Sequence, residues 1–174
     1  MQAFEFYCPT KIYFGKGAEA KVGEAVKHFG STKVFIVYGG HSAVKSGLIA
    51  RIEQTLTDAG LEHMSFGGVQ PNPRLSHARE GVQKALAFGA DFILGVGGGS
   101  VMDTAKLAGV LLDGSSTVHD LLEAPGRAKK CCPTLMIPTT AGTGSEATPN
   151  AIVAVPEQEL KVGIVSDAMI ADNV

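Results

Sequence analysis

The strongest constraint on the fold is the stretch DFILGVGGGSVMDTAKLAG at residues 91–109. An apolar run, typical of a strand buried on both faces, leads into three glycines and a serine. The segment that follows has the apolar periodicity of a helix and carries Asp103 and Lys106. A strand, a glycine-rich turn and a helix in direct succession are typical of a βα unit, so the stretch predicts a parallel sheet with helical crossovers.

The rest of the chain repeats this alternation. Strands are predicted at residues 33–38, 61–66 and 90–96, and helices at 17–29, 47–58, 75–88 and 100–112. The alternating segments FEFY and KIYFG predict a short N-terminal β-hairpin, and TLMIP, NAIVAV and LKVGIVS predict closely spaced strands after residue 133. The pattern predicts an α/β fold with right-handed crossovers.

Composition excludes several classes of function. The formal net charge is −2, from 15 basic and 17 acidic residues, so no basic excess indicates nucleic-acid binding. No apolar run reaches the roughly 20 residues that a membrane helix needs, and the start of the chain lacks the pattern of a signal peptide. Cys8, Cys131 and Cys132 lack CxxC spacing and are odd in number. Free thiols in a cytoplasmic protein are therefore expected.

Four predicted loops leave strands at the sheet edge where ligands bind in such folds. They cover residues 39–40, 67–73, 97–100 and 138–146, and all are rich in Gly, Pro, Asn, Ser or Thr. In the third, glycines and the following helix N-terminus suit a phosphate, although a tight turn capped by Ser100 explains the same residues. The spacing is neither G-x-G-x-x-G nor a P-loop.

The fourth loop, PTTAGTGSE at residues 138–146, places four hydroxyl side chains among small residues. Hydroxyls at the carboxyl end of a strand suit the recognition of ribose and phosphate. A flexible surface loop is the alternative interpretation of the same composition.

The segments GGGSVMDTAK and PTTAGTGSE, together with TKIYFGKGA and PNP, resemble the iron-containing alcohol dehydrogenase family. The resemblance runs in register from about residue 5 to residue 174. It implies a Rossmann-like dinucleotide-binding domain, similar in architecture to dehydroquinate synthase, that is followed in the family by a helical metal-binding domain. It also implies oxidation of alcohols, or reduction of aldehydes and ketones, with a nicotinamide cofactor and Fe²⁺. We expect residues 1–174 to form a single NAD(P)-binding domain, the N-terminal part of a two-domain enzyme whose helical domain is absent here.

Position by position, the resemblance implies a set of cofactor-binding residues. They are Gly39, Gly40, Asn72, Gly97, Gly98, Gly99, Ser100, Asp103, Thr139, Thr140, Thr143, Ile152 and Lys161. The four residues of the GGGS turn would hold the pyrophosphate, and Asp103 would lie near the nicotinamide. Three of these residues also have a structural explanation. Asp103 could be an exposed helix residue, Asn72 a turn former and Lys161 a solvent-facing lysine on a strand.

Gly39 bears on the choice between NAD and NADP. Family members that favour NAD often carry an acidic residue at this position, which would bind the ribose 2′-hydroxyl. Here the sequence is VYGGHS, which has no carboxylate to repel a 2′-phosphate, and Ser42 and Lys45 follow closely. We therefore favour NADP over NAD, with a purely structural turn at Gly39 as the alternative.

The resemblance implies that the Fe²⁺ ligands, one aspartate and three histidines, lie beyond this sequence. His28, His41, His63, His77 and His119 lack the i, i+4 spacing of a helical metal site, and Asp167 and Asp172 precede the matching aspartate position. No metal ligand and no catalytic residue is therefore assigned within residues 1–174. We expect the isolated chain to be inactive as a dehydrogenase.

Two other functions share these features. One is a lyase similar to dehydroquinate synthase, and the other is a non-catalytic nucleotide-binding module. PTTAGTGSE favours the dehydrogenase over the lyase, and an apolar end at AMIADNV disfavours a complete module. The expected partners are a nicotinamide dinucleotide, a small alcohol or aldehyde and further copies of the chain in a homo-oligomer, with no nucleic acid and no membrane.

Overall fold

The computed structural model describes residues 3–5, 7–112 and 114–174. Within them the helices are α1 (Val22–His28), α2 (Ser42–Lys45), α3 (Leu48–Asp58), α4 (Leu75–Phe88), α5 (Gly99–Leu111) and α6 (Val118–Glu123). The strands are β1 (Lys33–Tyr38), β2 (Glu62–Phe66), β3 (Phe92–Gly97), β4 (Thr134–Pro138), β5 (Asn150–Val155) and β6 (Leu160–Val165). Short 3₁₀ turns are η1 (Ala18–Lys21), η2 (Pro125–Arg127), η3 (Ser145–Ala147), η4 (Pro156–Gln158) and η5 (Asp167–Met169).

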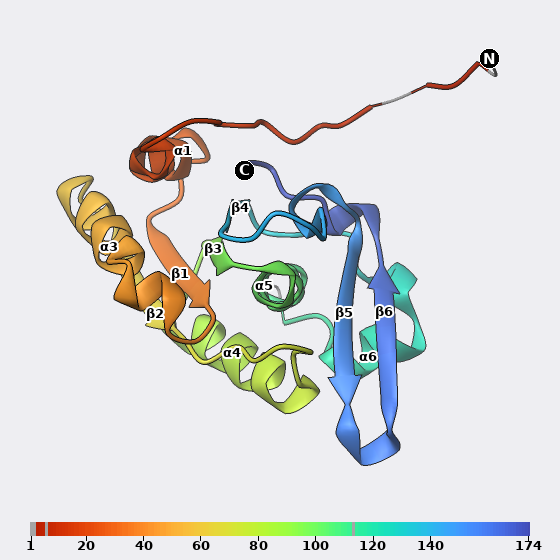
Figure 1. Ribbon diagram of the computed structural model, residues 1–174. Coiled ribbons are helices and arrows are strands. Elements are labelled where there is room, and N and C mark those ends of the chain that lie inside the picture. The colour runs from red at the N-terminus through yellow and green to blue at the C-terminus, as the bar shows by residue number, and fades with distance from the viewer. Residues whose placement is uncertain (1–2, 6, 113) are drawn as a thin grey trace.

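Four strands form one parallel sheet in the order β2-β1-β3-β4, and β5 and β6 form a separate antiparallel pair. Helices α2 and α3 connect β1 to β2, α4 connects β2 to β3, and α5 lies between β3 and β4 in the chain. Figure 1 shows α1 and α3 together, apart from α4 and α5. The predicted α/β class with a parallel sheet is confirmed.

The central strand β1 explains why its sequence is apolar without alternation. Val34 and Ile36 belong to the core formed with α1 and α3. Phe35 and Val37 belong to the core formed with α4 and α5. All four side chains are buried, because helices cover both faces of the sheet.

Helix α5 lies close against β3 because Gly95 has no side chain. A Cβ atom at Gly95 would lie 2.7 Å from the Met136 sulfur and 3.0 Å from the Ala105 Cβ. Such distances leave no room for a methyl group. The glycine in the middle of this strand is therefore a packing requirement.

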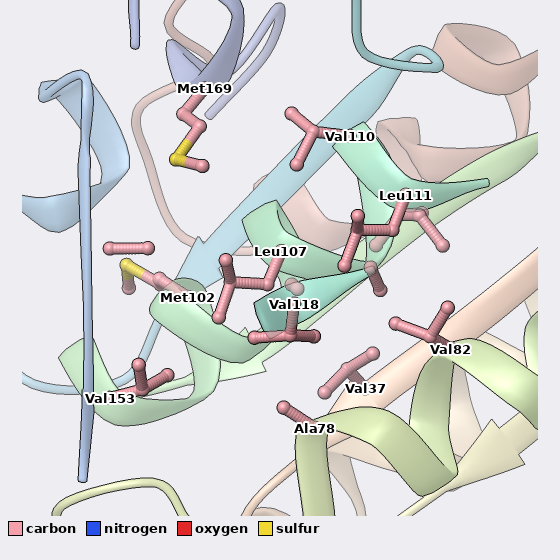
Figure 2. Packing of buried hydrophobic residues seen from close by; sticks show 14 of the residues in the cluster. Val37, Ala78, Val82, Met102, Leu107, Val110, Leu111, Val118, Val153 and Met169 are labelled. Carbon is pink, nitrogen blue, oxygen red and sulfur yellow. The ribbon is translucent and has the colours of Figure 1, made fainter. Parts of the chain in front are cut away.

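The outer side of α5 is covered by the β5–β6 pair (Figure 1). Every residue from Val101 to Leu111 is buried, and Figure 2 shows Met102 and Leu107 in the same cluster as Val153 and Met169. Two of these buried residues, Asp103 and Lys106, are ionisable, and both belong to the network described in the next subsection.

The predicted N-terminal hairpin was wrong within the described residues, and part of it falls on Phe6, which lies outside them. Lys11 instead pairs in parallel with Asn173. Its backbone N–H donates to the Asp172 carbonyl at 2.9 Å, and the Tyr13 N–H donates to the Val174 carbonyl at 2.7 Å. Strand alternation in the sequence did not specify the partner, and the free backbone groups of this segment pair with the last residues of the chain.

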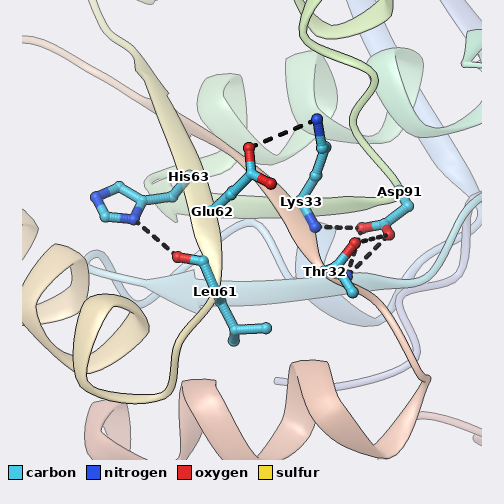
Figure 3. A network of polar contacts seen from close by, with 6 residues as sticks. All are labelled: Thr32, Lys33, Leu61, Glu62, His63 and Asp91. Carbon is cyan, nitrogen blue, oxygen red and sulfur yellow. Dashed lines mark hydrogen bonds and ion pairs between the residues drawn. The ribbon is translucent and has the colours of Figure 1, made fainter.

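Asp91 ties together the amino ends of β1 and β3. Its carboxylate accepts hydrogen bonds from the Thr32 N–H, at 2.8 and 3.0 Å, from the Lys33 N–H at 2.7 Å and from the Thr32 hydroxyl at 3.0 Å (Figure 3). Beside it, the Lys33 ammonium lies 3.5 Å from the Glu62 carboxylate of β2. This network lies at the sheet edge opposite the loops that could bind a ligand.

Candidate functional site

The loops that follow the parallel strands meet at one edge of the sheet. The Gly68 N–H, after β2, donates to the Gly39 carbonyl, after β1, at 3.1 Å. The Thr139 N–H, after β4, donates to the Gly97 carbonyl at the end of β3 at 2.9 Å. The four loops singled out in the sequence therefore form one surface, as the parallel topology requires.

The first hollow on this surface has a volume of about 250 Å³. Backbone and small side chains make up much of its lining. It is lined by Gly39, Gly40, Ser42, Ala43, Val69, Pro71, Val96, Gly97, Gly98, Gly99, Ser100, Val101, Thr139 and Thr140. No acidic or basic side chain is among these lining residues.

Gly98 and Gly99 differ in whether the structure has room for a side chain. Gly98 has an ordinary extended backbone, with φ −88° and ψ −173°, and a Cβ there would make only van der Waals contact, 3.5 Å from the Thr140 Oγ1. A Cβ at Gly99 would lie 2.7 Å from the Thr143 Oγ1, which is too close. Gly99 is thus required by the packing of the threonine loop, whereas the backbone at Gly98 accepts a side chain and the residue lines the hollow.

The predicted cap of α5 by Ser100 was wrong. Gly98 is the N-cap residue, and no side chain caps the helix. Ser100 lies within the first turn, where its carbonyl accepts a hydrogen bond from the Thr104 hydroxyl at 2.9 Å. The first backbone N–H groups of α5 therefore remain available to an anion.

The second hollow has a volume of about 270 Å³ and shares Gly99 and Ser100 with the first. The two hollows are therefore adjacent at the start of α5. The second is lined by Asn72, Pro73, Gly99, Ser100, Asp103, Thr143, Ser145, Thr148, Asn150, Ile152 and Lys161. In contrast to the first hollow, it contains a carboxylate and an ammonium group.

A buried polar network lies along one wall of the second hollow. The Ser145 hydroxyl donates to the Asp103 carboxylate at 2.7 Å, and the Lys106 ammonium donates to the Ser145 Oγ at 3.0 Å. Burial raises the pKa of the Asp103 carboxyl, against the hydrogen bonds from Ser145 and from the Ile152 backbone. Burial lowers the pKa of Lys106 to about 8, although the charges of Asp103 and Glu146 favour its protonated form.

Every residue that the resemblance assigned to a cofactor site lines one of the two hollows. The first hollow takes Gly39, Gly40, Gly97, Gly98, Gly99, Ser100, Thr139 and Thr140, and the second takes Asn72, Asp103, Thr143, Ile152 and Lys161. Asp103 is buried rather than exposed, which excludes its plainer interpretation. Ser42 lines the first hollow, whereas Lys45 is not among its lining residues.

The cofactor-binding residues assigned from the sequence did not include Lys106, Ser145, Thr148 or Asn150, although Ser145 is one of the four hydroxyl residues of the fourth loop. Lys106 follows Asp103 by three residues on a helix, a spacing that places both on one face, and this was the available signal. Its partners in the fourth loop and in β5 are 39 to 44 residues away, and nothing local points to them.

A larger hollow, of about 490 Å³, lies elsewhere, between residues 12–22 and β4. Its lining includes Ile12, Phe14, Leu135 and Ile137 and is mainly apolar. It lacks the glycine turn before α5 and the buried Asp103 carboxylate, so the smaller polar hollows are the better candidate for chemistry.

Among the described residues, no group of three or more His, Cys, Asp or Glu side chains could hold a metal ion. Asp172 has a structural role, since its carboxylate accepts the Thr134 N–H at 2.8 Å. Across the same part of the chain, no helix combines the length and apolarity that a membrane crossing requires.

The four-stranded parallel sheet and its helices define a Rossmann-like α/β domain, and comparisons with known proteins identify the family. The profile described as iron-containing alcohol dehydrogenase matches residues 9–174. The chain belongs to this family.

Two relatives and one solved structure illustrate the match. The chain is 35% identical over 171 residues to NADH-dependent butanol dehydrogenase A of Clostridium acetobutylicum, covering 97% of this chain and 43% of that protein. It is 37% identical over 172 residues to sulfoacetaldehyde reductase of Bilophila wadsworthia, covering 99% and 44%. The crystal structure of NADH-dependent butanol dehydrogenase A from Thermotoga maritima matches with a TM-score of 0.91 at 35% identity, covering 99% and 44%. The chain thus spans less than half the length of these proteins.

Proposed function

We propose that this chain binds a nicotinamide dinucleotide across the two hollows. The observation that carries the proposal is that the hollows meet at Gly99 and Ser100, on the first turn of α5. Unpaired N–H groups and the positive end of the helix dipole favour an anion there. A pyrophosphate at this point would leave one nucleoside for each hollow, which is the layout of a dinucleotide.

The cofactor fits the residues that are present. Gly97, Gly98 and Gly99 keep side chains out of the space in front of the helix, and Thr139 and Thr140 supply hydroxyl donors beside it. The second hollow supplies the Asp103 carboxylate, the Asn72 amide and the Lys161 ammonium for a more polar nucleoside. These are the groups that we propose to hold the cofactor.

The direction of the cofactor follows from the loop after β1. In parallel nucleotide-binding sheets, the loop at the end of a strand beside the glycine turn receives the adenosine ribose. Gly39 and Gly40 occupy that place in the first hollow. The nicotinamide half then extends into the second hollow, toward Asp103 and Lys161.

For the whole protein we propose an oxidoreductase that moves a hydride between an alcohol and its aldehyde or ketone. The family match and the names of the relatives support this class over the lyase and the non-catalytic module. The bound nicotinamide would supply or accept the hydride, and this chain would hold and orient it.

The family name implies Fe²⁺, but the described residues do not fit a metal site. We derive no step through the metal and assign no catalytic residue within residues 1–174. The isolated chain is expected to bind cofactor without turnover. Homo-oligomer formation and cytoplasmic location stay predictions.

NADP is the proposed preferred cofactor, with NAD as the second candidate. No carboxylate lines the first hollow, so nothing there repels a 2′-phosphate, and Ser42 can donate to it. The names of the butanol dehydrogenase relatives specify NADH, which favours the second candidate. The first hollow also has no cationic side chain to attract a 2′-phosphate, so we expect the preference for NADP over NAD to be modest.

Titration of the chain with NADPH and with NADH, followed by nicotinamide fluorescence, tests the proposal. We expect a saturable change with both, tighter for NADPH, and its loss in Gly98→Val at equal folded content by circular dichroism. The absence of any response at millimolar cofactor would contradict the proposal.

A further inference from the structure

Lys106 is a buried cation whose hydrogen bonds are all accounted for. Its side chain is 0% exposed. The ammonium donates to the Ser145 Oγ at 3.0 Å, to the Thr148 carbonyl at 2.8 Å and to the Asn150 carbonyl at 2.9 Å. An ammonium group has three N–H donors, so each has one acceptor. The lysine therefore joins α5 to the fourth loop and to the start of β5.

These contacts determine the direction of the Ser145 hydroxyl. A hydroxyl has one hydrogen to donate, and its oxygen can accept others. Because Lys106 donates to the Ser145 oxygen, the hydroxyl hydrogen is free to point to the Asp103 carboxylate, 2.7 Å away. The result is a directed chain of donors from Lys106 through Ser145 to Asp103.

Lys106 does not line either hollow, whereas Ser145 and Asp103 both line the second one. Any effect of the lysine on a ligand must therefore pass through the residues that it contacts. Ser145, Thr148 and Asn150 all line the second hollow, and of these Ser145 leads on to the Asp103 carboxylate. The charged groups that act on this network are Asp103 and Glu146 on Lys106, and Lys106 and Lys161 on Asp103.

We propose that Lys106 is a positioning residue for the nicotinamide half of the cofactor: through Ser145 it holds the Asp103 carboxylate in the orientation that accepts hydrogen bonds from the ligand. The proposal rests on the proposed function, in which the nicotinamide occupies the second hollow. Asp103 accepts from Ser145 at Oδ1 and from the Ile152 backbone. A carboxylate has about four lone-pair sites, so acceptor capacity remains for a donor such as an amide.

The test compares two ligands that differ only at the nicotinamide end. NADH contains the nicotinamide, and ADP-ribose lacks it but keeps the pyrophosphate, the adenosine and both riboses. Their affinities are measured by calorimetry for the unaltered chain, Lys106→Met and Ser145→Ala, with NADPH and 2′-phospho-ADP-ribose as the second pair. Leu107→Ala is the control, because Leu107 is equally buried on the same helix but has no part in the donor chain.

We expect Lys106→Met and Ser145→Ala each to weaken NADH binding about tenfold or more, with less than about a twofold change for ADP-ribose. The double variant should bind no more weakly than the weaker single variant, because both changes break one chain. Leu107→Ala should lower the melting temperature and leave the ratio of the two affinities unchanged.

Equal losses for NADH and ADP-ribose in the folded variants would mean a general structural role and would overturn the inference. Unchanged NADH binding would overturn it as well. If Lys106→Met does not fold, Ser145→Ala decides, since it removes the relay and leaves both carbonyl contacts of the lysine. An unaltered chain that binds neither ligand would overturn the proposed function and this inference together, whereas binding that the variants do not alter would overturn the inference alone.

Discussion

The Lys161 ammonium donates a hydrogen bond to the Asn72 side-chain oxygen at 2.7 Å, although 89 residues separate them in the sequence. Asn72 lies in the loop after β2, in the left-handed region with φ 57°, and Lys161 lies on β6. Both line the second hollow, so the contact joins its two sides. The surface lysine suggested by its strand position is thus part of the candidate site.

Replacing Lys161 with methionine should weaken dinucleotide binding about tenfold, because a charged donor is lost from the hollow. The melting temperature should change little, since Lys161 is exposed. Fluorescence titration and a thermal melt measure the two effects. Lys84→Met, which removes an exposed lysine of α4, is the control, and equal affinities in the two variants would contradict the role of Lys161.

Gly98→Val should abolish dinucleotide binding and leave the fold intact. The backbone at Gly98 has φ −88°, which a valine adopts, and its Cβ would meet only ordinary contacts. The side chain would occupy the space where a phosphate approaches α5. We expect a loss of affinity of at least about 100-fold, roughly 3 kcal/mol, at nearly constant melting temperature.

Two neighbouring variants provide the contrast to Gly98→Val. Gly99→Val should destabilise the fold, because its Cβ would lie 2.7 Å from the Thr143 Oγ1. Ser100→Ala should have a small effect on binding and almost none on stability, since Ser100 does not cap the helix. Wild-type affinity in folded Gly98→Val would show that the glycines serve only the turn.

Gly39→Asp should shift the cofactor preference from NADP toward NAD. A Cβ at Gly39 would lie 3.4 Å from the Val101 Cγ2 and 3.6 Å from the Val69 carbonyl oxygen, so the fold can accommodate the side chain. The new carboxylate would accept the ribose 2′-hydroxyl and repel a 2′-phosphate. The difference in binding free energy between NADPH and NADH should shift by about 1–3 kcal/mol in favour of NADH, and an unchanged affinity ratio would refute the prediction.

The depressed pKa of Lys106 predicts a dependence of stability on pH. Below about pH 8 the lysine is protonated in both the folded and the unfolded chain. Between its folded pKa of about 8 and its ordinary value of 10.5, only the unfolded chain keeps the proton, so this group makes the free energy of unfolding rise with pH.

Urea unfolding at a series of pH values measures this effect. The difference in free energy of unfolding between the unaltered chain and Lys106→Met should increase by about 2 kcal/mol from about pH 8 to pH 10. Taking the difference cancels the titration of groups far from Lys106. A difference that stays constant or falls over this range would contradict the lowered pKa of Lys106 in the folded chain.

Asp91→Ala should lower stability without affecting the candidate site. The substitution removes the acceptor for two backbone N–H groups and one hydroxyl at the start of β1. A loss of about 2 kcal/mol in the free energy of unfolding is expected from chemical denaturation. Dinucleotide affinity in the folded variant should stay the same, because the network lies at the opposite edge of the sheet.

The regular elements that depend on local pattern were predicted well from sequence. Strands β1 and β4 and helix α4 begin and end at the predicted residues, because a buried apolar run and a terminal glycine are local signals. The loops at the carboxyl ends of the strands followed from the parallel topology. The individual site residues came from the family resemblance, and the structure placed them together in two hollows.

Only the tertiary structure could show contacts between residues that are far apart in the sequence. The N-terminal segment pairs with Asn173 rather than with itself, since its alternation specifies extended backbone but not which chain segment completes its hydrogen bonds. Asp103 and Lys106 are polar positions in the sequence of a helix, yet both are buried, and their hydrogen-bond partners lie in the fourth loop and at or near the start of β5. By itself the sequence determined a parallel α/β sheet with glycine and threonine loops at one edge. The buried Lys106 ammonium donates hydrogen bonds to Ser145 and Asn150, which only the tertiary structure brings close to it. Such acceptors are needed because a buried charge without hydrogen bonds is costly to desolvate.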